Sequence, residues 1–339
     1  MSVFNRLAGR FARGSFLAPS LLALALGAGG LTQASAQTVL KAAHSSATTS
    51  TGHKALEFMA KELAQRTDGR VTMEIFPSSQ LGSEREAVES IQLGNLDMAF
   101  VSSAVLGAFN PEFFALDIPF LFKDREGVYR VLDGQIGLGL LDSLNAVGIK
   151  GLGYWENGFR QLTNNVRPIR SPKDLEGMKM RTMENEVHIA AWKAVGANPA
   201  PLAFGELFTA LQQGTFDAQE GPINLFYDMK FYEVQKFISR TNHVYSPWPV
   251  LINPDVYNSL SEGDRKVLDT VVKEATTYQR QLAQEADEKA AAAMTGVQII
   301  DLTPEELLAF SSRMGPIVDM VKKKIGPKVV EAIQAEVAR

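Results

Sequence analysis

The chain lacks the residue types that most often build metal, redox and disulfide sites. It contains no cysteine, which excludes disulfides, zinc-thiolate centres and a lipid-anchored N-terminal cysteine. Its few histidines show no HxxxH or HExxH spacing. We therefore expect no metal and no cofactor, and we expect ordinary polar or packing roles for His44, His53, His188 and His243.

Sequence motifs of catalysis and nucleotide binding are also missing. "GLGYWENG" (151–158) begins like a nucleotide-binding turn but lacks the third glycine and a following helix. No GxxxxGK, GxSxG or SxxK pattern occurs. "HSSATTSTGH" (44–53) combines hydroxyls with two histidines, yet a polar loop that caps the next helix explains it better than a nucleophile does. Because the loop follows a predicted strand, a ligand-binding role is about as well supported as capping.

The N-terminal segment has the layout of a secretory signal peptide. Arginines at positions 6, 10 and 13 precede an apolar run over residues 16–31, and small residues at 34–36 follow. We expect cleavage after Ala36 and a location in the periplasm. Cleavage removes three arginines and no acidic residue, which lowers the formal net charge from −4 to −7. An acidic chain has no general attraction for nucleic acid or anionic membranes, and no later segment is long and apolar enough to span a bilayer.

The remaining chain alternates strands and helices, which predicts an α/β fold with a mainly parallel sheet. A length of 339 residues favours two domains, and several chain crossings predict a cleft between them. The predicted strands are 38–44, 70–76, 96–103, 149–155, 159–164, 178–183 and 297–302. The predicted helices are 53–66, 84–93, 124–144, 185–195, 222–233 and 261–295, with another starting at Thr303-Pro304. Residues 215–221 are interpreted as a link.

Two arginines stand where the chain passes between the predicted lobes. In "MKMRTMENE" (178–186), Arg181 shares a strand face with Lys179, opposite Met178 and Met180. Arg160 lies in "NGFRQLTNN", at the predicted crossing between lobes. An arginine can pair bidentately with a ligand carboxylate. Periodicity alone favours the alternative of surface salt bridges, with Glu184 or Glu186 as partners of Arg181.

Longer stretches resemble a known family over nearly the whole predicted mature chain. They are "GRVTMEIFPSSQLGSEREAVESIQLGNLDMAFVSS", "FFALDIPFLF", "WENGFRQLTNN", "SPKDLEGMKMRT", "GANPAPLAFGELFTALQQGTFDAQE" and "KFYEVQKFISRTNHVYS". Together they resemble the DctP-type solute-binding proteins of tripartite ATP-independent periplasmic (TRAP) transporters. The resemblance implies a two-lobe periplasmic-binding-protein fold with a ligand cleft between the lobes and a long helix that spans both. We assign 37–157 and 247–286 to lobe I, and 158–246 and 287–339 to lobe II.

The resemblance also implies the ligand-binding residues. Arg181, the arginine of the family's "KxR" strand, is expected to form the main salt bridge to a carboxylate, with Arg160 also in the cleft; we expect both guanidinium groups to lack a protein partner before the ligand arrives. This chain departs from the family at "AQEG", where many members read "GQEN", so Gly221 is expected to leave room or a water site. The full set of expected ligand contacts is Arg181, Arg160, Glu84, Ser102, Ser103, Phe204, Gly221, Asn224 and His243.

The expected function is capture of a small organic acid in the periplasm by a monomeric protein, and delivery to an ion-gradient-driven TRAP permease. Hydroxyl and amide side chains in the expected cleft favour a sugar acid such as a uronate or aldonate, with C4-dicarboxylates next. One alternative is a binding module that feeds a sensor kinase, since it would need the same cleft. A periplasmic enzyme is less well supported, because the scattered histidines provide no general base or metal cluster.

Overall fold

The computed structural model describes residues 37–339, so the predicted signal peptide, with Ala36, lies outside the described residues. The strands are β1 (Thr38–Ala43), β2 (Val71–Phe76), β3 (Met98–Phe100), β4 (Lys150–Asn164), β5 (Lys179–Thr182), β6 (Asn198–Pro201), β7 (Ala218–Pro222), β8 (Phe237–Arg240), β9 (Tyr245–Ile252) and β10 (Gln298–Asp301). The α-helices are α1 (Thr51–Arg66), α2 (Glu84–Gln92), α3 (Ser103–Leu106), α4 (Arg125–Asp133), α5 (Gln135–Ser143), α6 (Glu186–Ala194), α7 (Leu207–Gln212), α8 (Ile223–Asp228), α9 (Pro254–Ser259), α10 (Glu262–Ala293), α11 (Pro304–Ser311), α12 (Gly315–Ile325) and α13 (Pro327–Val337). The predicted α/β class is confirmed.

The strands form a mixed sheet in the order β2-β1-β3-β9-β4-β7-β5-β6, with β8 and β10 off this path. β1 is parallel to β2 and β3, and β5 is parallel to β6 and β7. β9 runs antiparallel to β3 and β4, and β4 runs antiparallel to β7 and β8. The prediction of a mainly parallel sheet is therefore wrong at the centre of the path, where β9 and β4 run antiparallel to each of their neighbours.

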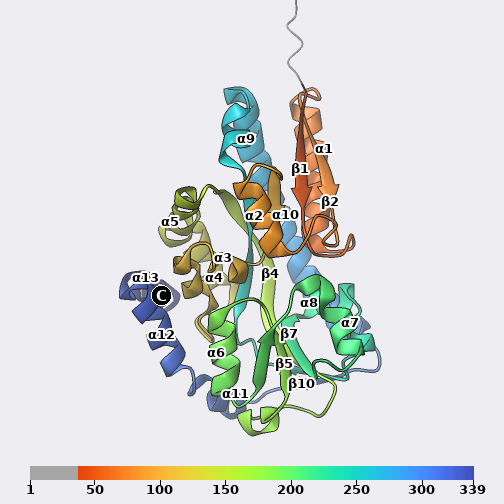
Figure 1. Ribbon diagram of the computed structural model, residues 1–339, viewed down its shortest axis with the longest axis vertical. Coiled ribbons are helices and arrows are strands. Elements are labelled where there is room, and N and C mark those ends of the chain that lie inside the picture. The colour runs from red at the N-terminus through yellow and green to blue at the C-terminus, as the bar shows by residue number, and fades with distance from the viewer. Residues whose placement is uncertain (1–36) are drawn as a thin grey trace, which may run out of the picture. The chain divides into compact units, whose positions relative to one another are not determined.

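β4 joins the two halves of the fold. Its first part pairs with β9 and its last part with β7 and β8, so the predicted strands 149–155 and 159–164 are one continuous strand. The register shifts between Glu156 and Gly158, and Gly158 has φ +123°, which side chains rarely adopt. Figure 1 shows β4 in the middle of the molecule, with β1 and β2 towards one end and β5, β7 and β10 towards the other.

The long helix predicted at 261–295 is confirmed as α10. It begins at the N-cap Ser261, whose side chain accepts a hydrogen bond from the Asp264 amide. α10 contacts α1 and β4 in one part of the fold and α8 in the other. Near its middle, the buried Gln279 hydrogen-bonds both the amide and the carbonyl of Glu156. The helix therefore holds β4 next to the register shift at Gly158.

Other predicted elements differ from the structure. The predicted helix 124–144 is divided into α4 and α5 at Gly134, where an added Cβ would lie 2.5 Å from the Arg130 carbonyl oxygen. Residues 215–221, interpreted as a link, contain the buried strand β7. Strand β9 was not predicted. The predicted helix 222–233 is shorter, because α8 ends at Asp228.

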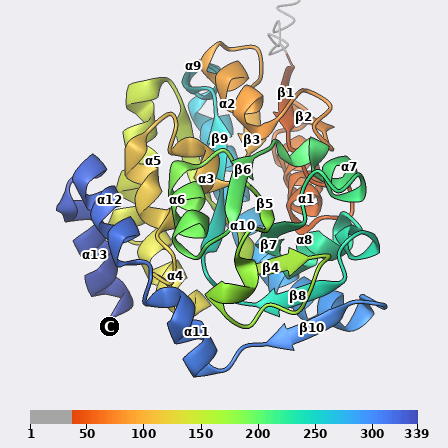
Figure 2. The ribbon, with the colours of Figure 1, turned by 60° about the horizontal axis from the view of Figure 1, so that its bottom comes forward.

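The hydrophobic core surrounds the sheet on both sides. One buried cluster joins α1 and α10 to the central strands through Trp155 and Trp248. Another packs α7 and α8 around Phe231 and Ile238. The C-terminal helix α13 packs on α4 and α5, as Figure 2 also shows. The residue boundaries of the lobes given above stay a prediction. Within residues 37–339, no helix is both long and apolar enough to cross a membrane.

Gly158 offers a test of how β4 couples the two lobes. We predict that Gly158→Ala weakens ligand affinity by about tenfold, because a side chain at φ +123° costs about 1–2 kcal/mol and resists adjustment of the strand. Gly177→Ala is the matched control, since Gly177 has φ +76° but no atom within 4 Å of an added Cβ. The control should lose similar stability and keep its affinity. Titration calorimetry and urea unfolding of both variants separate the two effects, and equal affinities would contradict the prediction.

Candidate functional site

A narrow pocket lies where the ends of several strands meet the N-termini of short helices. Polar and charged side chains line one part of it and apolar side chains the other. Its lining residues are Ser45, Ser46, Glu84, Ser102, Asn157, Arg160, Arg181, Met183, Phe204, Glu220, Leu225 and Trp248. The space that water could occupy inside is about 20 Å³, room for one or two molecules.

Arg181 is buried in this pocket at the end of β5. Its side chain is 2% exposed, and its Nε and Nη2 donate to the Leu202 carbonyl oxygen at 2.9 and 2.6 Å. It forms no ion pair with a carboxylate of the described residues. Burial lowers the pKa of Arg181 to about 10, although Glu220 partly opposes this effect. The structure thus holds a desolvated cation that donates to a neutral carbonyl oxygen.

The interpretation of Arg181 as a surface charge, which periodicity alone favoured, is wrong. Glu186 pairs instead with Lys324 at 2.7 Å, and Glu184 forms no ion pair within residues 37–339. Lys179, on the same strand face, is about half exposed and lies 3.6 Å from Asp217. The difference arises because Lys179 begins β5 at the rim of the sheet, whereas Arg181 is covered by the segment around Leu202.

Arg160 has a protein partner, which corrects the expectation of two unpaired guanidinium groups. It forms a bidentate ion pair with Glu220, with Nη2 and Oε1 2.7 Å apart, and also donates to the Glu220 carbonyl oxygen. His243 Nε2 lies 3.1 Å from the same carboxylate. Burial tends to raise the pKa of Glu220, but Arg160 and His243 hold it well below its usual range. Adjacent strands β4 and β7 bring these residues together, since Arg160 lies opposite Pro222 in the register.

A chain of polar groups forms another part of the pocket wall. Glu84 begins α2 behind the N-cap Ser83 and accepts hydrogen bonds from Ser45 Oγ at 2.9 Å and the Ser102 amide at 3.3 Å. Burial raises the pKa of Glu84 despite these hydrogen bonds. Ser102 Oγ lies 3.0 Å from Ser246 Oγ, which accepts from Asn157 Nδ2 at 3.4 Å. This wall presents oxygen acceptors and no cation.

Some of the residues expected to bind ligand line the pocket and others lie behind it. Arg181, Arg160, Glu84, Ser102 and Phe204 are in the lining. Phe204 stands beside Phe231 in an edge-to-face arrangement, with ring centroids 5.9 Å apart. The other expected contacts, which are outside the lining, are Ser103, Gly221, Asn224 and His243.

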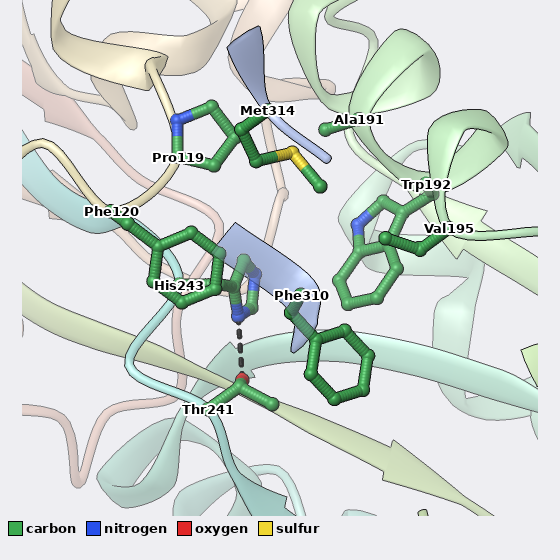
Figure 3. A pocket seen from close by; sticks show the side chains of 9 residues that line it. All are labelled: Pro119, Phe120, Ala191, Trp192, Val195, Thr241, His243, Phe310 and Met314. Atoms are coloured by element: carbon green, nitrogen blue, oxygen red, sulfur yellow. Dashed lines mark hydrogen bonds between the residues drawn. The ribbon is translucent and has the colours of Figure 1, made fainter. Parts of the chain in front are cut away.

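Each residue outside the lining has its own surroundings. Ser103 begins α3 with its hydroxyl buried, and Asn224 is buried in the first turn of α8. At Gly221 an added Cβ would lie 3.2 Å from the Phe226 ring, so the expected free space is filled by Phe226. His243 bonds Glu220 on one side and Thr241 at 2.7 Å on the other. Figure 3 shows His243 in an adjoining apolar pocket with Trp192, Phe310 and Met314.

Sequence reasoning missed several lining residues. The loop with Ser45 and Ser46 was considered as a binding loop, and its capping role is confirmed because Ser50 Oγ accepts from the His53 amide. Asn157 and Glu220 lie inside the family-like stretches and could have been found there. No sequence pattern around Met183, Leu225 or Trp248 indicates that these residues line a binding site. In residues 37–339, no group of three or more His, Asp or Glu side chains is arranged to hold a metal ion.

The fold and the pocket define a class of protein, a two-lobe α/β binding protein with a polar cleft that contains a buried arginine. Residues 42–324 match the family model of bacterial extracellular solute-binding protein, family 7 (DctP). The chain belongs to this family, the solute-binding proteins of TRAP transporters. This confirms the resemblance and the two-lobe fold with its long helix. The family is one of transport proteins and not of enzymes.

Individual relatives match this chain over most of their length. The 2,3-diketo-L-gulonate-binding periplasmic protein YiaO of Escherichia coli is 37% identical, over 87% of this chain and 90% of that protein. A TRAP periplasmic solute-binding protein from Polaromonas, bound to D-erythronate, is 40% identical with a TM-score of 0.85, over 88% and 99% of the two chains. Another from Sulfurospirillum deleyianum, with bound succinate, is 34% identical with a TM-score of 0.85 and the same coverage.

Proposed function

We propose that the protein captures a small organic acid in the periplasm and delivers it to an ion-gradient-driven TRAP permease. The ligand carboxylate pairs with Arg181, and a hydroxylated monocarboxylate of the sugar-acid type binds better than a C4-dicarboxylate. The observation that carries the proposal is the buried Arg181 guanidinium, which forms no ion pair with a carboxylate of the described residues.

A buried cation without a counterion is unfavourable, and a ligand carboxylate removes that cost. The Leu202 carbonyl satisfies two N–H groups of Arg181, whereas the charges of Glu220 and Glu84 act on it without forming an ion pair. A carboxylate that accepts from the remaining donors forms charge-assisted hydrogen bonds in a water-poor site. If lobe closure brings these donors and the carboxylate together, the ligand favours the closed state through its higher affinity for that state.

Glu84 supports a hydroxylated ligand over a dicarboxylate. The wall around Glu84 offers carboxylate and hydroxyl oxygens, which accept hydrogen bonds from ligand hydroxyls. The two cations of the lining are Arg160, which is paired with Glu220, and Arg181, which is assigned to the first carboxylate, so a second carboxylate near the Glu84 carboxyl would find no unpaired cation in the lining. Relatives with D-erythronate and with succinate are both known, so the ligand class of this chain depends on its own side chains.

A thermal-shift screen of residues 37–339 tests the function. We expect aldonates and uronates to raise the unfolding temperature more than succinate does, and the neutral polyol erythritol to have no effect. A ligand present at 100 times its dissociation constant stabilises the folded state by about 2.7 kcal/mol. Absence of a shift with every carboxylate would refute the function. A larger shift with succinate than with any sugar acid would refute the ligand class alone.

A further inference from the structure

We propose that Asn157 recognises the hydroxyl group on the carbon next to the ligand carboxylate, so that the protein selects 2-hydroxy acids over their 2-oxo and 2-deoxy counterparts. This inference rests on the proposed function and narrows its ligand class.

Asn157 has one unsatisfied polar atom in the pocket wall. Its side chain is 3% exposed and lines the same pocket as Arg160 and Arg181. Its Nδ2 donates to Ser246 Oγ at 3.4 Å, whereas its Oδ1 is buried and accepts from no donor within residues 37–339. A buried acceptor without a donor is costly, and most such atoms in proteins are satisfied by another group. A ligand in this pocket can supply the missing donor.

The register shift in β4 places Asn157 in the same pocket as the arginines. In a regular strand, residues 157 and 160 would point to opposite faces. The shift between Glu156 and Gly158 breaks this alternation, and both side chains line the pocket. The ligand group that reaches Asn157 is therefore close to the group that the arginines hold. For a carboxylate held there, the neighbouring substituent is the one on carbon 2.

In the structure, the Nδ2 end of the Asn157 amide faces Ser246. Ser246 Oγ accepts from Nδ2 and is also bonded to Ser102 Oγ, whose neighbouring amide binds Glu84. This orientation leaves Oδ1 for the ligand, and Oδ1 can only accept. A 2-hydroxyl can donate to it. A 2-oxo group would set two acceptor oxygens against each other, and a 2-deoxy acid would leave Oδ1 unpaired.

Matched ligands provide the test. Titration calorimetry of residues 37–339 would compare D-erythronate, 3,4-dihydroxybutanoate and 3,4-dihydroxy-2-oxobutanoate, with the same triplet of six-carbon acids if those bind more tightly. We expect the 2-deoxy and 2-oxo acids to bind about ten- to a hundredfold more weakly than the 2-hydroxy acid. Equal affinities for the 2-hydroxy and 2-deoxy acids would overturn the inference but leave the proposed function intact. No binding by any carboxylate would overturn both.

Two variants test whether Asn157 causes the discrimination between 2-hydroxy and 2-deoxy acids. In Asn157→Leu, which removes the acceptor at similar volume, the affinity ratio of 2-hydroxy to 2-deoxy acid should fall to about one. Tyr245→Phe is the control, because the Tyr245 hydroxyl is also buried without a partner but does not line the pocket. It should keep the wild-type ratio. If a folded Asn157→Leu variant keeps the wild-type affinity ratio of 2-hydroxy to 2-deoxy acid, the assignment to Asn157 is overturned. If that variant does not fold, the comparison of ligands with the wild-type protein still decides the ligand class.

Discussion

Arg181→Lys is expected to weaken carboxylate binding by about 2–3 kcal/mol, roughly 30- to 150-fold, although the formal charge is preserved. Lysine cannot form the bidentate pair, and its shorter reach loses the Leu202 carbonyl that now positions the guanidinium. Burial also lowers the pKa of a lysine more readily, so part of the population would be neutral at this site. Titration calorimetry with the best ligand of the thermal-shift screen measures the loss.

Lys179→Arg is the matched control for this experiment. Lys179 lies on the same face of the same strand, but its side chain is about half exposed and interacts with Asp217. The exchange of one cation for another there should leave affinity and stability almost unchanged. Wild-type affinity in Arg181→Lys would show that Arg181 is not the carboxylate anchor, and the proposed function would lose its main support.

Glu220→Gln is expected to lower the free energy of unfolding by about 3–5 kcal/mol, because the buried Arg160 would lose its counterion. Urea unfolding without ligand measures this change. Glu285→Gln, which breaks an exposed pair with Lys289, is the control and should leave the free energy of unfolding almost unchanged. A loss in Glu220→Gln as small as that in the control would contradict the structural role of the pair.

The contribution of Glu220 also predicts a pH dependence. Arg160 and His243 hold its folded-state pKa well below the unfolded value of about 4.3. Its stabilisation is therefore fully present above that unfolded value and is lost as the pH falls through the folded pKa. The stability difference between the wild type and Glu220→Gln should be constant near neutral pH and shrink below about pH 4.

A double variant separates the stability of the pair from ligand binding. Arg160→Met combined with Glu220→Met should recover most of the stability lost in Glu220→Gln, since apolar replacement of a buried ion pair is often neutral. If Arg160 also contacts the ligand, this stable variant still binds weakly. Wild-type affinity in the double variant would limit Arg160 to a structural role.

Local patterns predicted the regular elements well and the irregular ones poorly. α1 follows from helical spacing, α10 from a long run rich in Ala, Glu, Lys and Gln, and β2 from its alternation. β9 was missed because "YSPWPVLI" contains two prolines, which argue against a central strand. β7 was missed because "AQEGP" is buried on both faces yet rich in polar residues. In both strands, pairing with β4 outweighs the local preference.

Local sequence patterns predict the candidate site less well than the regular elements. Alternation placed Arg181 and Lys179 on the same strand face. Only the covering segment at Leu202 explains why Arg181 is buried while Lys179 stays in contact with water. Alternation would also separate Asn157 from Arg160, which the register shift brings into one pocket. The partnership of Arg160 with Glu220 joins residues on two strands that are neighbours only in the folded sheet.

The sequence by itself determined many of the strands and helices, the long helix α10 and, through its family-like stretches, the class of protein. These properties depend on periodicity, capping and motifs, which act over short distances along the chain. The tertiary structure alone decided which arginine has a counterion, which stays without one, and which side of β4 faces the pocket. Burial and ion pairing depend on residues far apart in sequence, such as Leu202 over Arg181 and Glu220 beside Arg160, so only the packing of the folded chain fixes them.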